Sequence, residues 1–152
     1  MGAGQKERKN DSDRQKLYNE LIQNVYTVAY YMTADEEAAE WITEESMLTW
    51  MQQHRQLVSD SRALISLYKT CLSYCFTYLG KPKHAASNGC ASTETHIEWI
   101  QTLPAEGRAG IVLCYVLDLG REEAGEALGK SKQEILRLLA ESKNALLATR
   151  AG

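Results

Sequence analysis

Apolar residues recur at three- and four-residue steps along almost the whole 152-residue chain, a spacing typical of amphipathic helices. The clearest example is the series Leu17, Leu21, Val25, Val28 and Met32. No stretch alternates apolar and polar residues between turn-forming residues, as a half-buried strand would. The sequence therefore predicts an all-α fold.

Capping and breaking residues divide this pattern into helices. Thr33 and Asp35 suit the start of the second helix, and Gly80 and Pro82 end the third. The expected helices cover residues 12–32, 36 to about 51, 61–79, 94–103, 105–117, 121–128 and 131–149.

In the second helix we expect the core-facing residues to be Ala38, Trp41, Ile42, Leu48 and Met51. The third helix carries an apolar stripe from Leu64 to Leu79. Both helices would then pack against the first.

Composition along the chain indicates two helical domains. We predict a polar N-terminal arm (1–16), a first domain (17–80), a linker (81–93) and a second domain (94–149). Residues 17–61 contain eight acidic residues and one basic residue, whereas residues 62–93 contain four basic residues and no acidic one. This asymmetry suggests two surfaces with different partners.

The last two helices have the pattern of a helix-turn-helix. A short helix (121–128) is followed by a turn containing Gly129 and then by a longer helix. Ser131 and Glu134 have the Ser-x-x-Glu spacing of a capping box at the start of that helix. The alternative is an ordinary helical hairpin within a bundle. Residues expected to face inward are Ala124, Leu128, Ile135, Leu139, Ser142 and Leu146.

Both domains resemble RNA polymerase sigma factors of the small, extracytoplasmic-function type. The second domain resembles sigma region 4, and the first resembles sigma region 2. The residues that match region 4 are Leu103, Pro104, Arg108, Ile111, Val112, Leu113, Leu119, Glu122, Glu123, Ala124, Ala127, Leu128, Gly129, Ser131, Ile135, Leu139 and Leu146. The residues that match region 2 are Ala29, Thr33, Asp35, Ala39, Glu40, Ile42 and Glu45.

The resemblance implies a protein that binds core RNA polymerase and directs promoter-specific transcription, with no catalytic chemistry of its own. In the family, region 2 binds the clamp helices of the β′ subunit and opens the −10 element. Region 4 binds the flap of the β subunit and places its recognition helix in the major groove at the −35 element. An anti-sigma protein is a further possible partner, and Trp50 and Tyr74 are candidates to stack on unpaired bases.

Two sets of site residues follow from this resemblance. The expected contacts with polymerase are made by Glu40, Trp41, Glu44 and Glu45. The expected contacts with DNA, from basic residues and the outward positions of the last helix, are made by Arg121, Lys130, Lys132, Gln133, Glu134, Arg137, Leu138 and Glu141.

The chain departs from the family at both surfaces. Trp41 and Glu44 stand where Asp and Gln are usual, and Leu138 and Glu141 stand where the recognition helix usually has Arg. Lost phosphate contacts weaken DNA binding. A second hypothesis is therefore a degenerate sigma-like protein that binds polymerase or an anti-sigma partner and reads little DNA. Leu136 and Leu138, if exposed together, would form an apolar patch for such a partner. A third reading is a helical regulator that dimerises.

No signal peptide or membrane span is evident, so we expect a cytoplasmic protein with no membrane partner and with reduced cysteines. No metal, cofactor or enzymatic activity is expected. The alternative is a zinc or redox site formed by Cys71, Cys75 and Cys90 with His84 and His96, although their spacing matches no strong zinc pattern. The acidic run at residues 35–45 is expected to be a solvated helix face.

Overall fold

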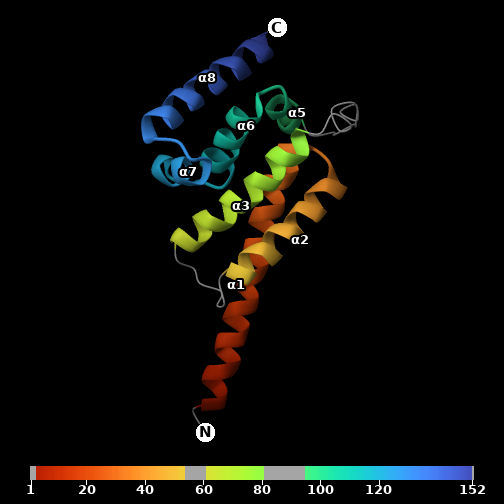
Figure 1. Ribbon diagram of the computed structural model, residues 1–152, viewed down its shortest axis with the longest axis vertical. Helices are drawn as coiled ribbons and strands as arrows, with labels where there is room; N and C mark the ends of the chain where they lie inside the picture. The colour runs from red at the N-terminus through yellow and green to blue at the C-terminus, as the bar shows by residue number, and fades with distance from the viewer. Residues whose placement is uncertain (1–2, 54–60, 81–94, 152) are drawn as a thin grey trace.

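The computed structural model describes residues 3–53, 61–80 and 95–151, and every regular element in these segments is helical (Figure 1). No strand occurs in the described segments, and the predicted all-α fold is confirmed. Side chains are described for residues 12–53, 62–80 and 97–148. The predicted linker at residues 81–93 lies outside the described residues.

The N-terminal half is a three-helix bundle of α1 (Ala3–Thr33), α2 (Glu36–Gln53) and α3 (Ser61–Leu79). The predicted stripe on α1 is buried in its core, apart from the half-buried Leu17. Trp50 is fully buried as well, and its Nε1 donates a hydrogen bond to the carbonyl of Ala63 at 2.8 Å.

Helix α1 begins at Ala3, not at residue 12 as predicted, and includes most of the segment expected to be a polar arm. Residues 5–9 (QKERK) are good helix formers but contain no apolar residue, so apolar periodicity could not reveal them. Figure 1 shows this first part of α1 extending away from the rest of the molecule.

A tight reversal joins α1 to α2. Ala34 adopts a left-handed conformation with φ of 53°. The carboxylate of Asp35 then accepts hydrogen bonds from the backbone N–H groups of Glu37 at 3.0 Å and Ala38 at 3.3 Å, which confirms the predicted N-cap. The hydroxyl of Tyr78 also donates to Asp35, at 2.9 Å, and so connects the cap to the end of α3.

The predicted inner face of α2 is partly wrong. Ala38 and Ile42 are buried, but Trp41, Leu48 and Met51 are exposed by 49%, 57% and 41%. The stripe that packs on α1 and α3 also includes small and polar residues. A prediction based on the largest apolar residues therefore placed Trp41, Leu48 and Met51 on the buried side of α2, although they lie on its exposed side. The buried residues of α2 are Ala38, Ala39, Ile42, Thr43, Ser46, Met47 and Trp50.

The C-terminal half contains α5 (Thr95–Gln101), α6 (Ala105–Ile111), the π-helical segment η1 (Val112–Val116), α7 (Arg121–Leu128) and α8 (Lys132–Ala151). The bounds of α7 agree with the prediction. The single helix predicted over residues 105–117 instead changes to π-helical hydrogen bonding, in which the N–H of Leu117 bonds to the carbonyl of Val112 at 3.0 Å.

The two halves pack against each other. Helix α3 lies along α7, and α1 contacts α5, α6 and η1 (Figure 1). Among the described elements, α2 contacts only α1 and α3, and α8 contacts only α5, α6 and α7. The outer faces of α2 and α8 therefore stay uncovered in this arrangement.

Two side chains of the C-terminal half cap the end of α1. The side-chain amide of Gln101 donates to the carbonyl of Tyr31, and the guanidinium of Arg108 donates to the carbonyl of Met32. Carbonyls in the last turn of a helix have no partner within the helix and lie at the negative end of its dipole. A cation and an amide from the other half of the chain supply these partners.

Arg108 also organises its own half. Its Nη2 donates to the carbonyl of Gln101 at 3.1 Å and to that of Leu103 at 3.0 Å. The side chain is 9% exposed, and burial lowers the pKa of the guanidinium. Arginine nevertheless stays charged in proteins, so Arg108 is a buried cation shared between the two halves.

Candidate DNA and polymerase interfaces

Helices α7 and α8 form the predicted helix-turn-helix. Gly129 ends α7 in a left-handed conformation with φ of 69°, which glycine adopts without strain. The N–H of Lys130 then bonds to the carbonyl of Gly125 at 2.7 Å. A Cβ at Gly125 would lie 2.5 Å from the carbonyl oxygen of Lys130, so the turn packs directly on the bare backbone of α7.

The capping box at the start of α8 is confirmed. The Ser131 hydroxyl accepts from the N–H of Glu134, and the Glu134 carboxylate accepts from the N–H of Ser131, both at 3.2 Å. The N–H of Ser131, followed by the Ser131 hydroxyl, stabilises the ionised carboxylate and holds the pKa of Glu134 below its ordinary value. The Glu134 carboxylate is therefore hydrogen-bonded to the backbone at the start of α8. The sequence predicts instead that it contacts DNA.

Most of the predicted DNA contacts lie together at the N-terminal part of α8. A shallow hollow of about 160 Å³ is lined by Lys130, Glu134, Arg137, Leu138 and Glu141. Three further candidates, Arg121, Lys132 and Gln133, are exposed but do not line the hollow.

Three of the four predicted cations of this surface are paired with carboxylates. Lys130 lies 3.2 Å from Glu106, and Lys132 lies 3.7 Å from Glu122. Arg137 is bound through its Nε to Glu141, one turn further along α8, at 3.1 Å. Sequence analysis missed Glu106 and Glu122, because these carboxylates come from the starts of α6 and α7.

The predicted outward position of Leu138 is only partly confirmed, since its side chain lines the hollow but does not project freely from α8. Leu138 is half-buried and packs against the core. An added Cβ at Gly110 would lie 3.2 Å from its Cδ2, so Leu138 leans onto α6. Leu136 is 42% exposed. The two leucines are not exposed together, and the apolar patch considered for a protein partner is not formed by this pair.

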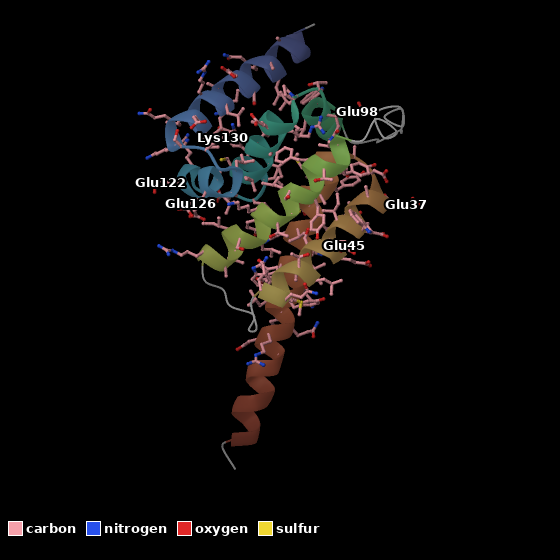
Figure 2. The ribbon with its side chains drawn as sticks, in the orientation of Figure 1. Glu37, Glu45, Glu98, Glu122, Glu126 and Lys130 are labelled. Carbon is pink, nitrogen blue, oxygen red and sulfur yellow. The ribbon has the colours of Figure 1, made fainter. Side chains whose placement is uncertain are left out.

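The predicted polymerase contacts lie on the uncovered side of α2. Glu40, Trp41 and Glu44 are exposed, and Glu45 is half-buried. The Trp41 ring meets the ring of Tyr74 edge-on, with centroids 5.8 Å apart, so α3 holds it in place. In Figure 2, Glu45 projects from α2 near this surface.

Leu48 and Met51 extend this surface, and sequence analysis had assigned them to the core. They follow Trp41 at seven and ten residues, so all three lie on one side of the helix. Glu44 lies between Trp41 and Leu48 on this same side, three and four residues away from them, so the surface combines apolar and acidic side chains.

The other candidate residues have structural roles. Trp50 is buried and is not available to stack on bases, and the half-buried Tyr74 hydroxyl lies 2.9 Å from the Thr49 hydroxyl. Cys71 and Cys75 are buried free thiols, and contact with Cys71 together with burial raises the pKa of Cys75. No group of three potential metal ligands occurs among the described residues.

Cys90 and His84 lie outside the described residues, as does the side chain of His96. The described helices include none that is both long and apolar enough to cross a bilayer.

Similarity to known proteins is found at the level of structure. No protein-family model matches the sequence, and no curated protein matches it significantly.

One similar structure is the sigma factor RpoE in complex with the anti-sigma factor NepR from Bartonella quintana. The TM-score is 0.71 at 14% identity, over 88% of this chain and 94% of that one. Another is CnrH in complex with the cytosolic domain of CnrY, with a TM-score of 0.71 at 15% identity over 98% of this chain and 94% of that one. These matches span both halves of the chain, which therefore has the all-α fold of sigma factors.

Proposed function

We propose that this chain is a divergent sigma factor that binds core RNA polymerase and directs promoter-specific transcription initiation. The observation that carries the proposal is a capped helix-turn-helix whose α8 is uncovered, in a chain with the sigma-factor fold over nearly its full length. The protein acts by binding, and no catalytic role is assigned to any residue.

Each uncovered helix has a role in this proposal. The acidic and apolar side of α2, including Glu40, Trp41, Glu44 and Glu45, binds the clamp helices of the β′ subunit. The C-terminal half binds the β flap, and α8 enters the major groove of the −35 element. Arg121, Lys130, Lys132 and Arg137 contact phosphates.

An anti-sigma protein is the third proposed partner, because the similar RpoE structure is a complex with the anti-sigma factor NepR. The packing of α3 on α7 also suggests a conformational step. We propose that the halves separate when polymerase binds, which would expose the side of α3 that packs on α7.

The second candidate is a sigma-like protein that binds polymerase or an anti-sigma partner and reads little DNA. The ion pairs of Lys130, Lys132 and Arg137 favour it, since each must be exchanged before the cation can contact a phosphate. The engagement of Glu134 in the capping box favours it as well.

Binding to purified core RNA polymerase, with and without promoter-library DNA and at low and moderate salt, separates these candidates. A working sigma factor binds polymerase and gives salt-sensitive, sequence-selective DNA binding together with transcription from a cognate promoter. The sigma-like protein binds polymerase without selectivity for DNA. Absence of polymerase binding by both the intact chain and a chain cleaved between residues 81 and 93 would contradict the sigma-factor proposal and would leave, of the second candidate, only a protein that binds an anti-sigma partner.

A further inference from the structure

The ion pairs at the start of α8 place carboxylates beside the cations that are proposed to bind DNA phosphates. Glu106 lies in the first turn of α6 and Glu122 in the first turn of α7, yet both reach basic residues at the entry to α8. Figure 2 shows Glu122 and Lys130 in this part of the molecule. The third pair, between Arg137 and Glu141, continues the arrangement along α8 itself.

We infer that Glu106, Glu122 and Glu141 act as internal competitors of DNA phosphates and thereby lower the affinity of α8 for DNA of any sequence. This inference rests on the proposed function, because it concerns DNA binding by the helix-turn-helix. A DNA phosphate must displace one carboxylate for each cation that it binds.

Displacement lowers the affinity for every DNA sequence by the same factor, because phosphate contacts carry no sequence information. The affinity contributed by contacts with base edges is not reduced by these pairs. The ratio of the affinities for specific and nonspecific DNA is therefore unchanged, and the quantity that the pairs lower is the affinity for both.

The pairs are exposed, so each one has a small effect. The side chains of Glu106, Glu122 and Glu141 are exposed by 61%, 78% and 64%, and of their three partners only Lys130, at 21%, is half-buried. Exposed ion pairs contribute little and are screened by salt. Removal of one competitor is expected to raise the affinity for DNA roughly 1.5- to 5-fold at low salt.

The test uses the full chain and a short duplex of mixed sequence, with binding measured by fluorescence anisotropy. The variants are Glu106→Gln, Glu122→Gln and Glu141→Gln, which remove the charge and keep the shape of the side chain. Glu126→Gln is the matched control, because Glu126 is exposed on α7 one turn after Glu122 and forms no ion pair with any described residue (Figure 2). We expect each of the three variants to bind more tightly and the control to bind as the unchanged chain does.

A second measurement distinguishes pairing from a general charge effect. The gain from Glu106→Gln should disappear when Lys130 is also changed to Gln, because the lysine is the group that the substitution releases. The gain should also decrease between about 50 and 200 mM salt.

Four results would overturn the inference. An equal gain for Glu126→Gln would show that net charge alone matters, and a gain that persists without Lys130 would show the same. Measurable binding with no gain for any variant would refute the competition and leave the DNA-binding proposal intact. Absence of binding by every variant at low salt would refute both.

Discussion

The capping of α1 by the C-terminal half can be tested with Gln101→Ala. This substitution removes the side-chain amide that donates to the Tyr31 carbonyl. It keeps the backbone carbonyl of residue 101 that accepts from Arg108. The perturbation therefore affects the contact between the halves and leaves the hydrogen bonds within the C-terminal half in place.

The expected loss follows from one hydrogen bond. Gln101 is half-buried, so water can partly replace the lost donor, and the cost is about 1 kcal/mol. For a chain of this size that corresponds to a decrease in the unfolding temperature of about 2–4 °C. Arg108→Met removes donors to the carbonyls of Met32, Gln101 and Leu103, so its cost is about 3 kcal/mol.

Thermal unfolding followed by far-UV circular dichroism measures both effects, and small-angle X-ray scattering reports whether the halves separate. Gln52→Ala is the control, because Gln52 is exposed on α2, which contacts no element of the C-terminal half among those described. If Gln101→Ala unfolds at the same temperature as the control, the amide does not stabilise the packed arrangement and the reasoning is refuted.

Further substitutions test the helix-turn-helix and the α2 surface. Gly125→Ala places a Cβ 2.5 Å from a backbone oxygen and should cost about 1–3 kcal/mol in urea unfolding, whereas Gly120→Ala, with only a flexible carboxylate at 3.6 Å, should cost far less. Equal costs would contradict the close packing of the turn. The pKa of Glu134 is lower in the folded state than in the unfolded state. Its ionised carboxylate therefore stabilises the fold at any pH above the unfolded-state pKa, and this stabilisation is lost as the pH falls through the folded-state pKa. Glu134→Gln should remove that acid sensitivity, and an unchanged pH profile of unfolding would argue against the capping box as its source. Trp41→Ala should weaken binding to core polymerase by about tenfold or more with little change in stability, and undiminished binding in a pull-down titration would place the polymerase contact elsewhere.

Sequence patterns were most reliable where the determining interactions are local. The capping box, the bounds of α7 and the Asp35 cap are set by residues within a few positions of one another, and all three are confirmed. The prediction for α2 was wrong for part of the helix because packing on α1 and α3 selects the buried face. Small residues such as Ala39 and Ser46 carry as much of that face as large ones.

The candidate site was only partly predictable for the same reason. The exposure of Lys132 and Gln133 follows from helix periodicity. The pairing of Lys130 with Glu106 does not, because the carboxylate comes from a different helix. Likewise, no local pattern indicates that Arg108 reaches a carbonyl 76 residues earlier in the chain.

The capping of the end of α1 by Gln101 and Arg108 has a consequence for synthesis on the ribosome. The first three helices emerge before residues 101 and 108, so the nascent chain lacks the Gln101 and Arg108 donors to the carbonyls of Tyr31 and Met32 until the second half follows. The last turn of α1 is then free to fray, and the finished N-terminal bundle completes this helix end only when α5 and α6 dock on it. A nascent chain stopped after residue 80 should accordingly show weaker amide protection at the end of α1 than the complete protein does.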